Sequence, residues 1–331
     1  MTPRANRGAI LVTGGAGFIG SHAARALAQG GERIIICDPV TGPVAARNLS
    51  GVPVEAHLQP HVLAGFLDAE GAHVSAIIHM GAISATTETN VARIIANNIT
   101  LSQTLWTFAA NARVPFIYAS SAATYGSGAL GFDDAFDAQA LARLRPLNIY
   151  GWSKLVFDRW VEAELRAGRA APPQWAGLRF FNVYGTHEEH KGPQSSVVSQ
   201  LLPRLARGEA ARLFRSHHPG YADGGQLRDF VYVGDCVRVI AWLLSSGASG
   251  LFNVGTGQAR SFLDLARACF AALGLPEKIE FIDMPEALRA QYQYFTQANV
   301  ARLKAASFPH RMTSLEDGVA ECARDWRKEN S

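Results

Sequence analysis

Short runs of apolar residues alternate with longer amphipathic stretches along the first 180 residues of the chain. The apolar runs are rich in β-branched residues, end at turn residues and have the length of buried strands; they cover 9–13, 33–37, 76–80, 115–119 and 177–182. The stretches between them are long enough for helices that cross from one strand to the next, at 18–29, 87–111 and 150–166. This alternation predicts an α/β fold of the Rossmann type, a doubly wound parallel sheet with helices on both faces.

The regular alternation ends after residue 182. A loop-rich segment follows at 184–226, with a helical stretch at 195–207 and a Gly/Pro/Asp-rich part at 217–226. We expect this last part to be a mobile lid or an exposed turn. Further strands and helices are expected at 229–233, 251–254, 262–273 and 315–326.

A glycine-rich turn directly follows the first apolar run. Its sequence, TGGAGFIG at 13–20, joins the expected strand to the expected helix. Gly14, Gly17 and Gly20 allow a tight turn, a close approach of the backbone to a pyrophosphate, and close packing of the helix on the strand. The helix N-terminus presents its N–H groups and the positive end of its dipole to the phosphates. This segment predicts a dinucleotide-binding domain.

Asp38 ends the second apolar run, about twenty residues beyond the glycines. Its carboxylate can accept hydrogen bonds from the adenosine ribose, which favours NAD because the charge repels a 2′-phosphate. Arg47, in the loop expected next, can offset that repulsion and admit NADP, so both cofactors stay open on these residues. We expect a dinucleotide domain and a smaller C-terminal α/β substrate lobe, made of residues 8–182 with 228–258 and of residues 183–227 with 259–331 respectively.

A tyrosine and a lysine are one helical turn apart in the expected helix at 150–166. Tyr150 and Lys154, at i and i+4, point to the same side, so that the ammonium can favour the phenolate. An unperturbed tyrosine has a pKa of about 10 and is a poor base at neutral pH, and a nearby cation together with oxidised nicotinamide would lower that pKa. Ser121 follows the 115–119 run, at the carboxyl edge of the sheet where ligands bind. Its hydroxyl can hold a reacting oxygen while Tyr150 moves the proton.

Composition and charge exclude several other classes of function. Hydrophobic residues make up 48% of the 331 residues and charged residues 18%, as in a compact globular protein. The 31 Lys and Arg and the 28 Asp and Glu are scattered, without the basic patch of a nucleic-acid or membrane-surface protein. The N-terminus lacks a signal-peptide pattern, and no stretch approaches the roughly 18 apolar residues of a membrane span.

The cysteines and histidines do not form a metal-binding pattern. The four cysteines lie far apart, without C-x-x-C spacing: Cys37, Cys236, Cys269 and Cys322. We therefore expect no disulfide framework and no zinc site, as in a reducing compartment. Four histidines lack regular spacing and acidic neighbours, so no metal is expected at them: His187, His190, His217 and His218. His79 is interpreted as a packed strand residue near the cofactor, and Asp235 as the N-cap of a helix from Cys236.

Several longer motifs occur in order along the chain. They are GAISATTE at 81–88, YASSAATYG at 118–126, NVYG at 182–185, HKG at 190–192, RDFVYV at 228–233 and FTQA at 295–298. With the glycine turn, Ser121 and the Tyr150/Lys154 pair, they resemble the ADP-glyceromanno-heptose 6-epimerase family of the extended short-chain dehydrogenase/reductase superfamily, from about residue 10 to 306. The patterns SxTTE, HKG and FTQA are the most specific.

This resemblance implies an activity and the residues that perform it. Tyr150 and Lys191 match the two acid–base residues on opposite sides of the sugar carbon, Lys154 the lysine that tunes the tyrosine, and Ser121 the hydroxyl beside them. In the family, tightly held oxidised cofactor takes hydride from C6 of the ADP-heptose, and the transient ketone reorients and receives hydride on its other face. The product supplies L-glycero heptose for the lipopolysaccharide inner core in a Gram-negative cytoplasm.

The resemblance also implies the binding residues and partners. The cofactor, NADP with NAD possible, is expected to contact Gly14, Gly17, Phe18, Ile19, Gly20, Asp38, Met80, Gly81, Ala82, Asn97, Tyr150 and Lys154. The ADP-sugar is expected to contact Ser84, Asn182, Phe214, Arg228 and Tyr292. We expect a cytoplasmic isomerase that binds neither nucleic acid nor membrane and forms a homo-oligomer, a pentamer by resemblance.

Two departures from the family pattern concern the sugar. Pro193 and Gln194 follow HKG where the family often has small polar or basic residues, and the 217–226 segment is longer than in some members. They affect the expected sugar specificity more than the reaction type.

Three rival functions share parts of this pattern. A nucleotide-sugar 4,6-dehydratase would have Asp-Glu after the strand-end hydroxyl, where this chain has Ala122-Ala123. A UDP-hexose 4-epimerase is the nearer rival and is disfavoured by the HKG segment. An inactive cofactor-sensing or scaffold protein is disfavoured because the acid–base residues are intact.

Overall fold

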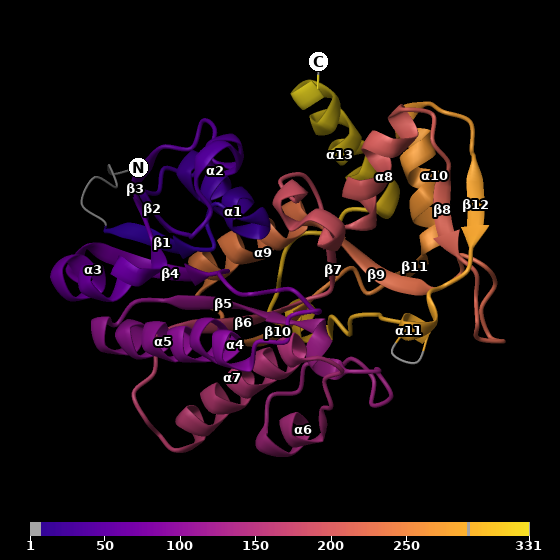
Figure 1. Ribbon diagram of the computed structural model, residues 1–331. Coiled ribbons are helices and arrows are strands. Elements are labelled where there is room, and N and C mark those ends of the chain that lie inside the picture. The colour runs from indigo at the N-terminus through magenta and orange to yellow at the C-terminus, as the bar shows by residue number, and fades with distance from the viewer. Residues whose placement is uncertain (1–7, 290–291, 331) are drawn as a thin grey trace. The chain divides into compact units, whose positions relative to one another are not determined.

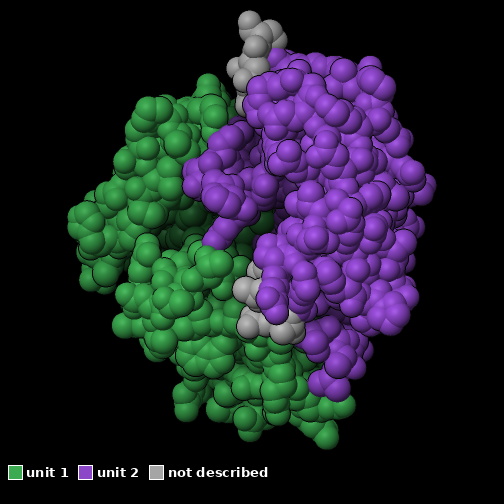
Figure 2. Space-filling model, turned by 45° about the vertical axis from the view of Figure 1, so that its right-hand side comes forward, with its two compact units in different colours: residues 1–126, 134–179, 237–252 green, residues 127–133, 180–236, 253–331 purple. Residues whose placement is uncertain are grey.

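The computed structural model describes residues 8–289 and 292–330, in two compact units (Figure 2). Unit 1 comprises the chain up to residue 126 with 134–179 and 237–252, and unit 2 comprises 127–133, 180–236 and the chain from 253. Residues 228–236 and 253–258, expected in the dinucleotide domain, thus belong to unit 2. The reason is that strand β9 (Leu227–Tyr232) pairs with strands of unit 2 and not with the main sheet.

Unit 1 is built on a seven-stranded sheet with the order β10-β6-β5-β4-β1-β2-β3. Its strands are β1 (Ala9–Thr13), β2 (Ile34–Cys37), β3 (Val54–Leu58), β4 (Val74–His79), β5 (Phe116–Ser121), β6 (Trp175–Phe180) and β10 (Gly250–Val254). β1 pairs in parallel with β2 and β4, β2 with β3, and β4 with β5. The strand order reverses between β1 and β4, the position at which doubly wound sheets bind ligands. This arrangement confirms the expected Rossmann-type fold.

Helices cover both faces of this sheet (Figure 1). On one face lie α3 (Leu63–Glu70), α5 (Leu101–Ala112) and α7 (Ile149–Arg166), and on the other α1 (Phe18–Gln29) and α9 (Val233–Ser246). The first group shares a core with the strands in which the Trp106 ring lies 5.9 Å from the Phe116 ring and 6.2 Å from the Trp160 ring. Because both faces are covered, β1 and β2 are buried along their whole length, which explains their uninterrupted apolar sequence.

The helix expected at 87–111 is interrupted. α4 (Val91–Ile94) is followed by a π-helical stretch, Ile95–Thr100, before α5 begins. Asn98 in this stretch is buried, and its side chain bonds both backbone groups of Ile83, accepting from the N–H at 2.8 Å and donating to the carbonyl at 3.0 Å. The wider turn places this amide inward, a local change that a 3.6-residue period does not predict.

Several further elements of unit 1 were not expected from the sequence. They are α2 (Gly42–Asn48), α3 and the edge strand β3. The side chains of β3 alternate between half-buried and exposed, so its sequence lacks the apolar run that marks the central strands. Arg47, expected in a loop, therefore lies on a helix, and α6 (Ala138–Arg143) precedes α7.

Unit 2 contains two small sheets and three long helices. β7 (Asn182–Tyr184) and β11 (Ala259–Ser261) flank β9, and β8 (Ala211–Phe214) pairs in parallel with β12 (Ile279–Ile282). The long helices α8 (Val197–Ala206), α10 (Phe262–Leu273) and α13 (Leu315–Asn330) share one apolar core with these strands. The shorter helices are α11 (Glu286–Arg289) and α12 (Ala301–Ala305).

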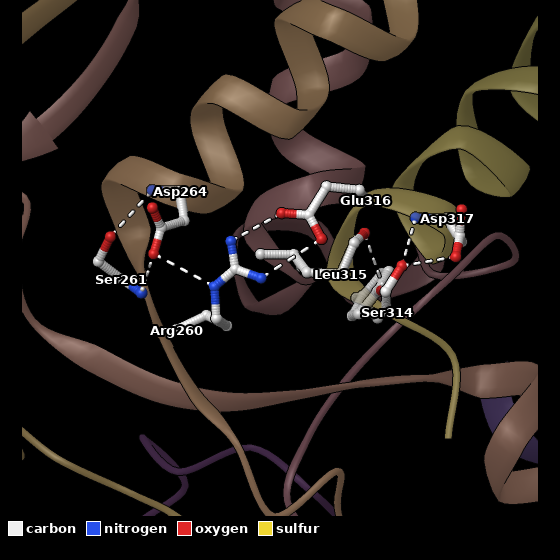
Figure 3. Close-up of polar contacts among 8 residues, drawn as sticks. Arg260, Ser261, Asp264, Ser314, Leu315, Glu316 and Asp317 are labelled. Atoms are coloured by element: carbon white, nitrogen blue, oxygen red, sulfur yellow. Dashed lines mark hydrogen bonds and ion pairs between the residues drawn. The ribbon is translucent and has the colours of Figure 1, made fainter. Parts of the chain in front are cut away.

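Arg260 connects the starts of α10 and α13 (Figure 3). Its guanidinium donates to both carboxylate oxygens of Glu316, at 2.7 and 3.3 Å, and to Asp264 at 3.3 Å. Ser261 caps α10 through a capping box with Asp264, and Ser314 accepts from the N–H of Asp317 at the start of α13. The two helix starts are therefore joined by one side chain.

Asp235 is not an N-cap. α9 begins at Val233, which places Asp235 inside its first turn. The buried carboxylate accepts from the N–H of Thr313 at 2.8 Å and from its hydroxyl at 3.0 Å. Its partner is thus a segment almost eighty residues away, which sequence spacing cannot indicate.

The 217–226 segment is held by its own contacts and by the strand-like segment at 292–295. The N–H of His217 donates to the Tyr294 hydroxyl at 3.0 Å, and the rings of His218, Tyr221 and Tyr294 lie 5.1 to 5.3 Å apart. Residues 217–220 are exposed, as expected of a turn. The aromatic cluster attaches this turn to its neighbour within unit 2.

Candidate active site

The glycine turn lies against the segment that follows β4. Gly14 has a φ of +66°, and a Cβ at this position would come within 2.6 Å of the backbone of Gly81. A Cβ at Gly20 would lie 2.1 Å from the carbonyl oxygen of Gly14. Only glycine permits this turn and this packing of α1 on β1.

The first turn of α1 contains no side-chain cap and no negative charge. Gly17 is the N-cap of the helix, and Phe18 and Ile19 are its first two residues. These N–H groups and the helix dipole fit the pyrophosphate of a dinucleotide, and the glycine cradle leaves room for it.

Met80, Gly81 and Ala82 follow β4 directly beside β1. The N–H of Met80 donates to the Thr13 carbonyl at 3.0 Å, and the N–H of Gly81 donates to the Thr13 hydroxyl at 3.2 Å. The expected cofactor residues at 14–20 and 80–82 therefore lie at the reversal of strand order. Ser84, a few residues further, is exposed.

Asp38 is buried at the end of β2. Its carboxylate accepts from the N–H of Ala16 in the glycine turn at 3.0 Å and from the N–H of Val40 at 2.7 Å. Asn48, at the end of α2, donates to the Ala16 carbonyl at 2.8 Å, which fixes α2 to the same turn. Arg47 precedes Asn48 and is exposed. Asp38 thus lies against the glycine turn expected to hold the pyrophosphate, at the position expected to meet the adenosine ribose.

Ser121, Tyr150 and Lys154 come together in unit 1. β5 ends at Ser121, and α7 begins just before Tyr150, with Asn148 as the N-cap that accepts from the N–H of Gly151 at 2.8 Å. The side chains of Ser121 and Tyr150 are hydrogen-bonded to each other. Lys154, one turn along α7, is only 4% exposed.

Burial controls the protonation of this group. It raises the pKa of Tyr150, and the hydrogen bond with Ser121 opposes that rise. It lowers the pKa of Lys154 to about 8, while the negative charge of Asp158 opposes that fall. Burial is the larger of the two effects on the phenol, and the lowering of its pKa expected from Lys154 together with oxidised nicotinamide stays a prediction.

Asn98 and not Asn97 reaches toward α7. The Asn97 amide donates to the carbonyl of Arg93 within its own helix, at 2.8 Å. The Asn98 amide donates to the Ser153 hydroxyl at 3.0 Å, and Ser153 in turn donates to the Tyr150 carbonyl at 2.7 Å. Asn98 was not among the expected residues, since only the π-helical stretch directs it inward.

His79, at the end of β4, is buried between two hydroxyl groups. Its Nδ1 lies 2.6 Å from Thr13 Oγ1 and its Nε2 lies 2.8 Å from Ser102 Oγ. Burial and then the charge of Lys154 lower the pKa of His79 to about 3. The imidazole is therefore neutral, as expected of a packed strand histidine.

Lys191 belongs to unit 2 and is bound to a buried carboxylate. It lies in the 3₁₀ segment Glu189–Gln194, together with Pro193. Its ammonium lies 2.9 Å from Oε2 of Glu188, which also accepts from the N–H of Ser196 at 3.0 Å. Glu188 is 1% exposed. Sequence reasoning did not identify Glu188, although it stands three residues before Lys191.

Arg228, Tyr292 and Phe214 form a second group in unit 2. The Arg228 guanidinium is buried between the rings of Tyr292 and Phe262, 5.3 and 5.6 Å from their centroids, and the Phe214 and Tyr292 rings are 6.3 Å apart. Burial lowers the pKa of Arg228. Among the described residues no carboxylate forms an ion pair with it. A buried guanidinium can bind an anionic group, and the aromatic rings beside it can pack on a planar group joined to that anion.

Asn182 is placed by the FTQA motif. The Thr296 hydroxyl accepts from the N–H of Asp229 at 3.2 Å and donates to Oδ1 of Asn182 at 3.3 Å. The N–H of Ala298 donates to the Asp229 carboxylate at 2.9 Å. The motif thus orients the Asn182 amide with its NH₂ group directed away from Thr296.

The residues that the structure describes contain no group of three or more His, Cys, Asp or Glu side chains able to hold a metal ion. The His218 ring instead accepts from the N–H of Gly220 at 3.0 Å. In the same part of the chain, none of the helices is both long enough and apolar enough to cross a membrane.

The chain is similar to known proteins over nearly its full length. The model of the NAD dependent epimerase/dehydratase family matches residues 10–255. The ADP-L-glycero-D-manno-heptose-6-epimerase of Nitratidesulfovibrio vulgaris (strain DP4) is 45% identical over 323 residues, 96% of this chain and 97% of that protein.

Two solved structures share the whole fold. The crystal structure of ADP-L-glycero-D-manno-heptose-6-epimerase from Helicobacter pylori has a TM-score of 0.80 at 27% identity, covering 99% of this chain and 98% of that one. The UDP-glucose 4-epimerase of Thermus thermophilus in complex with NAD has a TM-score of 0.73 at 25% identity, covering 96% and 98%.

Proposed function

This chain belongs to the NAD-dependent epimerase/dehydratase family, and we propose that it inverts C6 of ADP-glycero-manno-heptose, interconverting the D-glycero and L-glycero forms. It is a nicotinamide-dependent epimerase, an isomerase. The sugar is assigned from the heptose epimerases to which it is similar over nearly its full length.

The observation that carries the chemistry is the Tyr150 phenol hydrogen-bonded to Ser121, with buried Lys154 one turn away. Bound nicotinamide supplies the hydride acceptor and donor. Ser121 holds the oxygen of the reacting alcohol or ketone, and Tyr150 takes the proton from that oxygen or returns it. The charge of Lys154 favours the phenolate form when Tyr150 acts as base.

Inversion at one carbon requires proton transfer in two orientations of the sugar. We assign the second acid–base role to Lys191, as the family resemblance implies. Its ion pair with Glu188 supports a protonated ammonium, which can give a proton to the ketone oxygen as hydride returns. A freely mobile lysine would have no such fixed position.

The ADP part of the substrate is assigned to the group around Arg228. The buried guanidinium can bind a phosphate, and the adjacent rings of Tyr292 and Phe214 can pack on the adenine. Asn182 and Ser84 are assigned to the sugar side from the resemblance alone.

The cofactor is proposed to be NADP, with NAD possible. Arg47 lies on α2, the helix that Asn48 bonds to the glycine turn, and its charge is the one proposed to serve a 2′-phosphate. Asp38 opposes this choice by its charge, although both of its oxygens already accept backbone N–H groups. Action in the cytoplasm and assembly into a homo-oligomer, a pentamer in the resembled family, are also proposals.

The direct test is incubation of the purified protein with ADP-D-glycero-D-manno-heptose, with the configuration at C6 followed by NMR and UDP-glucose as the comparison substrate. We expect inversion at C6 and no reaction at C4 of UDP-glucose. Tyr150→Phe, which keeps the ring, should lower turnover by about 10² to 10⁴ with cofactor content unchanged. Inversion of UDP-glucose alone would replace the proposed function by a hexose 4-epimerase.

A further inference from the structure

Asp158 is a fully buried carboxylate on α7, one turn beyond Lys154 and two turns beyond Tyr150. It accepts four hydrogen bonds. Oδ1 accepts from the Tyr118 hydroxyl at 3.1 Å, and Oδ2 accepts from the Ser120 hydroxyl at 2.9 Å. Oδ2 also accepts from Nε and Nη2 of Arg179, at 3.1 and 3.0 Å.

These donors come from the strands beside the acid–base site. Tyr118 and Ser120 lie on β5, the strand that ends at Ser121, and Arg179 lies on β6. Sliding or rotating α7 against β5 would break bonds at a fully buried carboxylate, which is costly. This one side chain therefore fixes the helix that carries Tyr150 relative to the strand that carries Ser121.

The charge of Asp158 also acts on Lys154. The charged and titratable groups around this pair are His79 on β4, Tyr118 on β5, Tyr150 on α7 and Arg179 on β6. His79 is neutral, and Arg179 also stacks on the Tyr125 ring, 4.8 Å from its centroid. Among the causes that act on the pKa of Lys154, burial lowers it and Asp158 raises it.

We propose that Asp158 is a positioning residue of the acid–base site: it fixes α7 to β5 and holds its carboxylate one helical turn from Lys154. It touches no reacting atom. The expected effect of Asp158 on turnover rests on the proposed function. Its effects on the position of α7 and on Lys154 do not.

The effect of the Asp158 charge on Lys154 can be measured by NMR without substrate. The chain has only five lysines, so few lysine signals have to be resolved. Protein labelled with ¹³C at the lysine ε-carbon gives few NMR signals, and Lys154→Met identifies that of Lys154. In Asp158→Asn we expect the Lys154 titration midpoint, about 8 in the native protein, to fall by about one unit. Glu162→Gln, on the same helix and paired with Arg166, is the control and should not shift it.

The positioning effect needs variants that keep the ion pair. Ser120→Ala and Tyr118→Phe each remove one neutral hydrogen bond and leave Asp158 and Arg179 in place. Combined, they should lower kcat for C6 inversion about tenfold or more, with KM and cofactor affinity within about twofold and the Lys154 titration unchanged. Loss of cofactor affinity in step with kcat would instead indicate a general structural role.

The outcomes separate this proposal from the proposed function. An unchanged Lys154 midpoint in folded Asp158→Asn, or native kcat in the Ser120→Ala/Tyr118→Phe variant, would overturn it. If Asp158→Asn does not fold, the double variant, which retains every charge, decides the positioning role by its kcat. If the native protein does not invert the heptose, the proposed function fails, and the lysine titration still decides whether Asp158 acts on Lys154.

Discussion

At the scale of single residues, the hydrogen bonds around His79 determine its tautomer. The N–H of Gly81 donates to the Thr13 hydroxyl, and the Ser102 hydroxyl donates to the Asn98 carbonyl at 2.8 Å. Ser102 must then accept from Nε2–H of His79, and Thr13 must donate to Nδ1. The neutral imidazole with its proton on Nε2 is the form that satisfies every donor and acceptor in this set of buried hydrogen bonds.

The burial of a neutral His79 predicts that the stability of the protein depends on pH. The folded-state pKa of His79, lowered to about 3, lies below the ordinary value near 6.5, so between these values the unfolded chain binds a proton that the folded protein does not. The free energy of unfolding should therefore fall with decreasing pH by about 1.4 kcal/mol per unit below pH 6.5 from this residue. Urea unfolding at pH 7.5 and 5.5 should show this loss in the native protein and less of it in His79→Gln.

The control for this prediction is His73→Gln. His73 is 71% exposed and lies outside the buried chain of hydrogen bonds around His79, so its removal should leave the pH dependence as in the native protein. An equal pH dependence in native protein and His79→Gln would contradict the assignment of a buried neutral imidazole.

Lys191 carries the second residue-scale prediction. Lys191→Met keeps the aliphatic stem, removes the ammonium, and leaves the glycine turn and Asp38 in the other unit untouched. If Lys191 is the second acid–base residue, C6 inversion should fall by about 10² or more while the protein retains its cofactor. Steady-state kinetics with the ADP-heptose and mass spectrometry of the released cofactor provide the two measurements. A higher KM with native kcat would show that Lys191 contributes binding alone.

At the scale of elements, the starts of α10 and α13 depend on one side chain (Figure 3). Arg260 bonds Glu316 through two nitrogens and Asp264 through a third, and it is 33% exposed. A bidentate pair that is only partly exposed contributes more than an ordinary surface ion pair. The capping box at Ser261 makes the same turn rigid.

We therefore predict that Arg260→Ala lowers the free energy of unfolding by about 1 kcal/mol, measured by urea titration. Arg324→Ala is the matched control, because Arg324 is 60% exposed and pairs with Glu321 within α13 alone. It should cost about 0.3 kcal/mol or less. Equal effects of the two substitutions would show that the connection between the helices contributes nothing.

At the scale of the whole molecule, cofactor binding and stability are linked. The reaction regenerates its cofactor, so nothing is gained by releasing it, and the protein should purify with a dinucleotide bound. Ligand at a hundredfold its Kd stabilises the folded state by about 2.7 kcal/mol. Denaturing the protein and analysing the supernatant by mass spectrometry identifies the dinucleotide, and thermal unfolding with and without added cofactor measures the stabilisation.

The identity of the released dinucleotide reports on the residues at the end of β2. NADP is the expected result if the charge of Arg47 outweighs that of Asp38. NAD alone would show that Asp38 prevails. Absence of any dinucleotide, with no change in the midpoint temperature on addition of either, would contradict the assignment of the glycine turn.

The sequence by itself determined the features that depend on neighbours along the chain. Buried strands in a sheet covered on both faces are mostly apolar, so β1, β2, β4 and β5 were predictable within three residues. The glycine turn and the Tyr150/Lys154 spacing were predictable because each forms within a single turn or helix. The edge strand β3 lacked such a signal, because two of its five residues are exposed and the other three are only half-buried.

Only the tertiary structure decided which distant groups meet and what charge they carry. Asp158 receives donors from two strands, Asn98 is directed inward by a π-helical stretch, and Asp235 bonds Thr313. None of these contacts has a fixed spacing in the sequence. Protonation followed the same rule: burial raises the pKa of Tyr150, because the cost of desolvating a charge depends on everything packed around it and not on the order of residues.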